Sequence, residues 1–211
     1  MPANDNRRQK KIEIKRAKRK EQQRTVSRVE SSGVSGRTIA ARNWTVFDTR
    51  VGGTIEIEGM GCATIARRGP HGEVVGVIFL LDMYCLGVKD LTPYFGSESG
   101  WKQRMEHLNS GEGGMYAESP EAVRKLVEGA VEYAKSFGIE PCREWASAAH
   151  IFGDIDSSQC LKEFTYGRDG KPTFIAGPND GPARIQQILN ILSENPGDGN
   201  FHFMIPAESL E

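Results

Sequence analysis

The chain has 211 residues, a formal net charge of −1 and a hydrophobic content of 38%. This size fits one folded domain with a tail. The chain contains no apolar stretch of about 20 residues, the length that a membrane span requires, and none of its four cysteines forms a C-x-x-C pair typical of zinc ribbons or thioredoxin-like sites.

Positive charge is concentrated at the start of the chain. Residues 1–28 hold eleven Lys or Arg and three acidic residues, whereas the rest holds 16 basic and 25 acidic residues. This asymmetry is typical of a basic arm on an acidic body. We expect residues 1–36 to form a basic, disordered arm and linker, and residues 37–211 to form a single α+β domain.

The arm is the clearest functional signal in the sequence. Dense Lys and Arg side chains bind nucleic-acid backbones without reading the sequence, and disordered basic segments commonly fold on RNA. The sequence therefore predicts that residues 7–24 bind RNA or another polyanion; the alternative is a solvated tail without such a partner. The candidate binding residues are Arg7, Arg8, Lys10, Lys11, Lys15, Arg16, Lys18, Arg19 and Lys20.

Three strands are predicted at the start of the body. Residues 54–58 alternate apolar and polar side chains, which is typical of a half-buried strand. Residues 62–67 predict a second strand and residues 74–81 a third, and the short connections make them antiparallel neighbours. Because the third strand is apolar on both faces, we expect it to be central and covered by helices.

Residues 91–118 are rich in Gly and Ser and predict an irregular region with one short helix around Trp101, Met105 and Leu108. The strongest helix signal follows over residues 120–137, with Ser119 as N-cap and an apolar stripe at helical spacing. A second helix is predicted over residues 143–152.

The last third of the chain predicts β-β-α-β. Asp169-Gly170 lies between residues 164–166 and 173–175 and indicates a hairpin. A helix follows over residues 182–193, and residues 201–205 form the last strand. The predicted fold is thus α+β, an antiparallel sheet with strand 74–81 at its centre, packed by helices 120–137, 143–152 and 182–193.

Asp82, Cys85 and Lys89 follow the predicted central strand and are the candidate catalytic residues. One interpretation is a site in which Lys89 lowers the pKa of a nucleophilic Cys85. The other is structural, with Asp82 capping a helical turn and Cys85 an ordinary buried thiol.

Asp154 and Asp156 are the candidate metal ligands. Two carboxylates one residue apart on an extended segment face the same way and can share a divalent ion. Together with Asp82 they would form the acidic cluster of a metal-dependent hydrolase or nuclease. The alternative is that Asp154 and Asp156 only cap turns. No motif indicates a cofactor.

Residues 80–90, Leu-Leu-Asp-Met-Tyr-Cys-Leu-Gly-Val-Lys-Asp, resemble the signature of an uncharacterised family of bacterial hypothetical proteins with a Lys/Arg-rich N-terminal arm. Residues 128–134 and 164–172 are also similar to segments of that family. The resemblance implies no activity. From the basic arm we expect a cytoplasmic, non-catalytic accessory protein that binds RNA or another polyanion, and the alternative is a metal-dependent hydrolase or nuclease that uses Asp82, Asp154 and Asp156.

Overall fold

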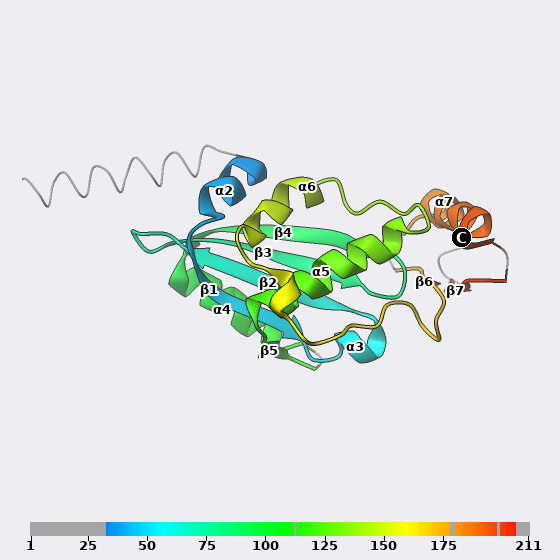
Figure 1. Ribbon diagram of the computed structural model, residues 1–211, viewed down its shortest axis with the longest axis horizontal. Coiled ribbons are helices and arrows are strands. Elements are labelled where there is room, and N and C mark those ends of the chain that lie inside the picture. Colours follow the sequence, from blue (N-terminus) through cyan, green and yellow to red (C-terminus); the bar gives the residue numbers. More distant parts are fainter. Residues whose placement is uncertain (1–32, 112, 178–179, 198, 206–211) are drawn as a thin grey trace, which may run out of the picture.

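The computed structural model of the chain describes residues 33–111, 113–177, 180–197 and 199–205. The predicted α+β fold is confirmed: helices pack on both faces of a five-stranded antiparallel sheet, and a separate two-stranded sheet lies near the C-terminal end (Figure 1). The predicted disordered arm, up to residue 32, lies outside the described residues. The division into an arm and a single domain remains a prediction.

The main sheet has the strand order β4-β3-β2-β1-β5. Its strands are β1 (Thr45–Gly52), β2 (Met60–Arg68), β3 (Glu73–Asp82), β4 (Gly87–Ser97) and β5 (Met115–Ala117). The predicted apolar strand is β3, which pairs with β2 on one side and β4 on the other. Its interior position in the sheet is as expected.

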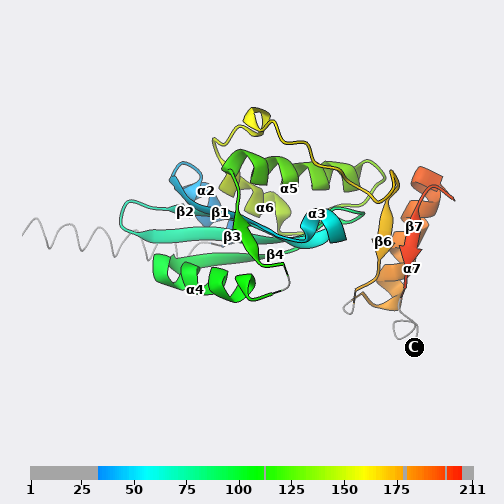
Figure 2. The ribbon, with the colours of Figure 1, turned by 90° about the horizontal axis from the view of Figure 1, so that it is seen from below.

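Both faces of β3 are covered, which explains its continuous apolar sequence. Val75, Val77 and Phe79 belong to the apolar cluster beneath α5 (Pro120–Lys135), α6 (Trp145–Ala148) and α2 (Val34–Ala41). Val74 and Ile78 point the other way and pack with Trp101 of α4 (Glu98–Asn109). Figure 2 shows α4 on the opposite side of the sheet from α5 and α6.

The predicted helices agree with the structure in two cases and in part in the third. Ser119 caps α5 by accepting the backbone N–H of Ala122. Helix α7 (Pro182–Leu192) begins with its proline, as predicted. The helix predicted over residues 143–152 divides into α6 and a 3₁₀ turn, η1 (Ala149–Phe152), which ends before Gly153.

The strand predicted over residues 54–58 is wrong, because this segment forms the short helix α3 (Ile55–Glu58). The segment lies in the connection of the β1–β2 hairpin, and these two strands already pair with each other. The backbone N–H groups of Ile57 and Glu58 donate instead to the carbonyl of Thr54. Gly59, with φ of 73°, ends the turn in the left-handed conformation that glycine tolerates.

Residues 91–118 are more regular than the sequence predicted. They contain most of β4, the whole of α4 and β5, so the predicted helix is confirmed but is longer. Pro93 lies within β4, which is an edge strand, where a missing N–H is tolerated. Strand β1 was not predicted at all.

The hairpin predicted between residues 164–166 and 173–175 is also wrong. The turn itself forms, with an isolated bridge between Arg168 and Lys171. Strand β6 (Thr173–Ile175), however, pairs in parallel with β7 (His202–Met204). Tyr166 is instead held against α5, where its hydroxyl donates to the carbonyls of Lys125 and Leu126.

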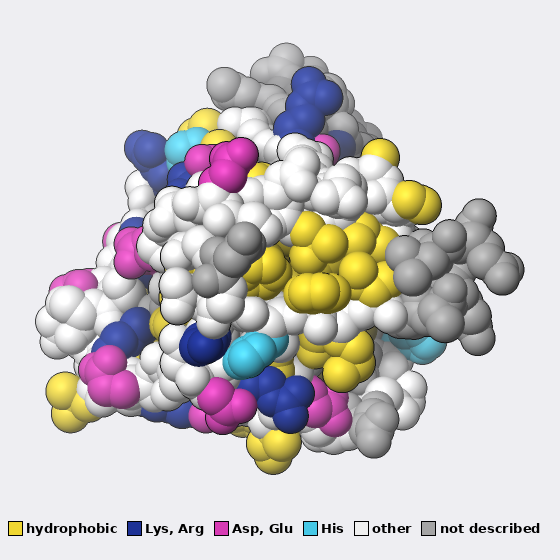
Figure 3. Space-filling model, turned by 90° about the vertical axis from the view of Figure 1, so that its right-hand side faces the viewer, with side chains coloured by type: hydrophobic (Ala, Val, Ile, Leu, Met, Phe, Trp, Pro, Cys, Tyr) yellow, Lys and Arg dark blue, Asp and Glu magenta, His cyan; other side chains and the backbone are white. Residues whose placement is uncertain are grey.

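The C-terminal elements form a unit beyond the end of the main sheet. Helix α7 packs with β6 and the end of α5 in a second apolar cluster, rather than on the main sheet, where it was expected. Phe203 and Met204 of β7 are 58% and 59% exposed, and Figure 3 shows hydrophobic side chains gathered at this end of the molecule. Two further short turns are η2 (Ser157–Gln159) and η3 (Ser193–Gly197).

Part of the predicted flexible linker is helical. Helix α2 begins at Val34, within the segment expected to be linker. The hydroxyl of Thr38, which is fully buried, donates to the carbonyl of Ser147 in α6 at 2.6 Å. The helix is therefore docked on the body, and the boundary predicted at residue 36 falls inside it.

Candidate functional site

Asp82 caps the turn that follows β3. Its Oδ1 accepts the backbone N–H groups of Tyr84 and Cys85, both at 2.9 Å. The carboxylate thereby satisfies amides that the short turn leaves unpaired. Of the two interpretations of Asp82 from sequence, these contacts match the structural one.

The second oxygen of Asp82, Oδ2, is buried and has no hydrogen-bond partner among the described residues. Burial raises the pKa of this carboxyl to about 6, although the backbone N–H groups of the turn and the charge of Lys89 act in the opposite direction. The side chain is only 2% exposed, so it does not line an open cleft.

Cys85 has the character of a core thiol. Its side chain is fully buried in the cluster with Leu86 and Phe137. Burial and the nearby charge of Asp82 raise the pKa of the thiol, whereas a nucleophilic cysteine needs a lowered pKa and access to a substrate. The arrangement therefore gives Cys85 neither property.

The side chain of Lys89 pairs with Asp180 and not with Cys85, the partner that the sequence suggested. Its Nζ lies 2.7 Å from Oδ2 of Asp180, next to the start of α7. Although burial acts to raise it, the pKa of Asp180 is held below its ordinary value by the hydrogen bond from Lys89 and by the backbone N–H of Gly177. Lys89 thus joins β4 to the C-terminal unit.

Asp154 is the exposed partner of a fully buried arginine. Oδ1 of Asp154 lies 3.1 Å from Nη2 of Arg67, and the exposed fractions of the two side chains are 76% and 2%. The other donors of Arg67 bind the carbonyls of Trp44, Ile151 and Phe152. The hydrogen bond from Arg67 lowers the pKa of Asp154.

Asp156 caps η2, where its carboxylate accepts hydrogen bonds from Ser158 and Gln159. These bonds lower the pKa of Asp156. Asp154 and Asp156 both line a surface hollow of about 470 Å³ beside the start of α5. The structure thus brings these two predicted ligands to one hollow. The carboxylate of Asp154, however, already forms an ion pair with Arg67.

Asp82 lies far from Asp154 and Asp156. Arg67, which holds Asp154, pairs with Val75 of β3, and Asp82 follows seven residues later on the same strand, roughly 23 Å away at 3.3 Å per residue. Among the described residues, no group of three or more His, Cys, Asp or Glu is arranged to hold a metal ion. The three carboxylates therefore do not share one site.

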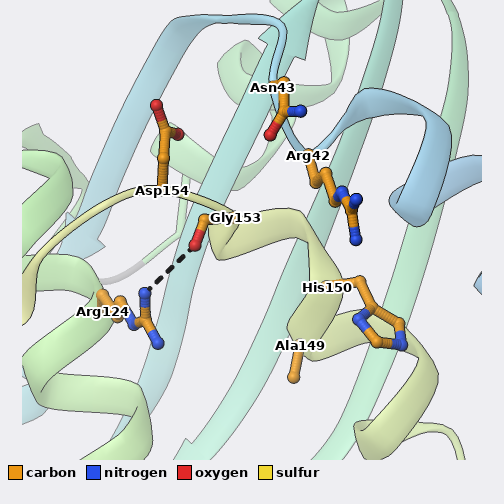
Figure 4. A pocket seen from close by; sticks show the side chains of 7 residues that line it. All are labelled: Arg42, Asn43, Arg124, Ala149, His150, Gly153 and Asp154. Carbon is orange, nitrogen blue, oxygen red and sulfur yellow. Dashed lines mark hydrogen bonds between the residues drawn. The ribbon is translucent and has the colours of Figure 1, made fainter.

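A second cavity, of about 410 Å³, adjoins this hollow and has a different character. It lies between the end of α2, η1 and α5, and Figure 4 shows its lining. Three of the lining side chains are basic: Arg42, Arg124 and His150. In Figure 4 the side chain of Arg42 extends toward the ring of His150, whereas Asp154 points away from both.

Arg124 is held firmly at one side of this cavity. Its Nε lies 2.9 Å from Oε1 of Glu128, one turn further along α5. Its Nη1 donates to the carbonyls of Gly153 and Ile155. The Nη2 group takes part in none of these contacts.

Gly153 allows the close approach that shapes the cavity. Its φ of 51° and ψ of −116° are unfavourable for residues with a side chain. A Cβ at this position would overlap the carbonyl oxygen of Arg42. The turn after η1 can therefore pack directly against the end of α2 only because residue 153 is glycine.

Sequence reasoning did not identify this basic cavity. Arg42, Arg124 and His150 come from three separate segments and share no motif spacing. Gly153 directly follows the predicted helix 143–152, and no local pattern indicates its contact with Arg42. The predicted arm residues, from Arg7 to Lys20, lie outside the described residues.

No helix in the described ranges is long and apolar enough to cross a membrane. No family model matches the chain, and neither the search of curated proteins nor the search of solved structures found a match.

Proposed function

We propose that the protein is a non-catalytic, RNA-binding accessory protein of the cytoplasm whose basic arm, residues 1–28, makes the principal contact with the RNA. The observation that carries this proposal is the division of charge, with eleven Lys or Arg among the first 28 residues and an excess of nine acidic residues in the remainder. Binding by such an arm is driven by release of counterions from the phosphate backbone and needs no sequence motif.

The acidic body supports the same assignment. Because its net charge repels a phosphate backbone, attraction is confined to the arm and to local basic sites. The arm joins the body at α2, which is docked through Thr38 and Ser147. A strand of RNA on the arm would therefore be held beside a fixed part of the fold.

The test compares the full chain with a chain that lacks residues 1–28. Affinity for a fluorescein-labelled single-stranded RNA is measured by fluorescence anisotropy at several salt concentrations. If six phosphates are contacted, the logarithm of the association constant of the full chain falls with the logarithm of salt with a slope of about −4. The truncated chain is expected to bind at least about 100-fold more weakly and with a shallow slope.

A length-matched control replaces the nine candidate residues of the arm with Gln in the full chain. This variant keeps the arm and removes its charge, so it should lose affinity like the truncated chain. If either variant binds the RNA as tightly as the unaltered chain, the proposed function is wrong. A heparin competition then shows whether the arm prefers RNA over other polyanions.

A further inference from the structure

We propose that the basic cavity lined by Arg42, Arg124 and His150 binds a backbone phosphate of the RNA strand held by the arm. This inference rests on the proposed function and adds a second, structured contact to it. The cavity, of about 410 Å³, falls in the range of known small-ligand sites. It is large enough for a phosphate and part of its nucleotide.

The cavity offers unused donors. Within the described residues, the side chains of Arg42 and His150 make no hydrogen bond or ion pair, and both are exposed at the mouth of the cavity. Nη2 of Arg124 is a third group not engaged in the contacts of that side chain. Charge-assisted hydrogen bonds from guanidinium groups to phosphate oxygens are among the strongest polar contacts that proteins make.

The charges nearby leave the cavity positive. Glu128 offsets part of the charge of Arg124, and Asp156 also interacts electrostatically with this arginine. Asp154, the acidic lining residue, is matched by Arg67 at 3.1 Å and points away from Arg42 (Figure 4). Among the residues that the structure describes, Arg42 has no such acidic partner, so its charge is available to an anion.

One of the three donors, Arg124, is held in place before a ligand arrives, and so is the backbone of Arg42. Arg124 is fixed by Glu128 and by the carbonyls of Gly153 and Ile155. Gly153 in turn packs on the carbonyl of Arg42. Such preorganisation lowers the entropy that binding must overcome.

The position of the cavity suits a strand that continues from the arm. The arm enters at the first residue of α2, and Arg42 follows its last residue. Eight helical residues span about 12 Å. This distance is short enough for one RNA strand to contact both the arm and the cavity.

The first experiment measures RNA affinity by anisotropy for full-length Arg42→Gln, His150→Gln and the double variant. The matched control is Arg104→Gln, which removes another exposed arginine, on α4 at the opposite face of the sheet. Each cavity variant should bind about three- to tenfold more weakly than the control, and Arg42→Gln should reduce the salt slope by about 0.7.

The second experiment observes the cavity directly. In the full-length protein, inorganic phosphate and the same RNA are titrated while the backbone amide resonances of His150, Gly153 and Asp154 are followed by NMR. The RNA should shift these resonances, and the Arg42→Gln variant should not respond.

The outcomes separate this inference from the proposed function. If deleting the arm abolishes RNA binding while the cavity variants bind like the Arg104→Gln control, the proposed function stands and the inference is overturned. If inorganic phosphate shifts the cavity resonances but RNA does not, the cavity takes free phosphate, and the inference is again overturned. If the chain without residues 1–28 binds RNA as tightly as the full chain, the proposed function fails, whatever the cavity variants show.

Discussion

The carboxylate of Asp82 accepts the backbone N–H of Cys85 at 2.9 Å, at the end of an interior strand and out of contact with solvent. One oxygen completes a turn, and the other is buried without a partner among the described residues. The cap therefore places a carboxylate charge where water solvates it poorly. Three predictions concern the buried polar groups of this fold.

The stability of the protein should depend on the protonation of Asp82. Its pKa in the folded state is about 6, above the ordinary value of 3.8. A raised folded-state pKa contributes stability that is fully present below about pH 4 and is lost as the pH rises through 6. The contribution is about 3 kcal/mol for a shift of about two pKa units.

Asp82→Asn keeps an oxygen for the cap and removes this titration. Urea unfolding from pH 4 to pH 7 should show the variant gaining about 2–3 kcal/mol relative to the unaltered chain as the pH rises. The control is Asp90→Asn, which makes the same substitution at an exposed residue on the neighbouring strand. Parallel curves for Asp82→Asn and the unaltered chain would show that Asp82 does not titrate in this range.

The ion pair between Lys89 and Asp180 should stabilise the attachment of the C-terminal unit. Its side chains are 15% and 3% exposed, so Lys89→Met leaves a buried carboxylate with less compensation. We expect a loss of about 3 kcal/mol in the free energy of unfolding, and recovery of much of this loss in Lys89→Met combined with Asp180→Asn.

The control for this pair is Lys135→Met. Lys135 pairs with Glu140 at 3.5 Å, and both side chains are largely exposed, so its removal should cost less than about 1 kcal/mol. Equal losses for Lys89→Met and Lys135→Met would contradict a special role for the buried pair.

Arg67 should be far more sensitive to a conservative change than its neighbour Arg68. Its guanidinium donates to three backbone carbonyls and to Asp154. Lysine cannot reproduce this planar set of donors, so Arg67→Lys leaves buried carbonyls unpaired and should cost roughly 3 kcal/mol by urea unfolding.

Arg68 points outward to Glu98, and its side chain is 46% exposed. Arg68→Lys should therefore change stability by less than about 0.5 kcal/mol. A small and similar effect at both positions would mean that the bonds of Arg67 are replaced by water.

The parts of the fold that were predictable are those with strong local signals. The stripe of α5, with Ser119 and Pro120 at its start, and the apolar run of β3 both appear where expected. Residues 54–58 also carry a clear period of two, yet they form a helical turn, because β1 and β2 pair with each other and leave no strand edge for them. In β4, Pro93 and Gly96 obscured a similar alternation.

The candidate site was less predictable than these elements, because most of it also depends on contacts between distant parts of the chain. Asp82 could be recognised as a cap because its partners are two and three residues away. The cavity depends on Arg42, Arg124 and His150, which meet only when α2, α5 and η1 pack together. Long-range packing of this kind leaves no regular spacing in the sequence.

The docking of α2 has a kinetic and thermodynamic consequence. Since the hydroxyl of Thr38 ties this helix to Ser147 of α6, the attachment point of the arm is fixed relative to the cavity. In the proposed complex, an RNA strand bound to residues 1–28 would meet the body as an intramolecular partner, at an effective concentration of order millimolar. Under that condition, even a weak contact on the body would noticeably lengthen the lifetime of the complex.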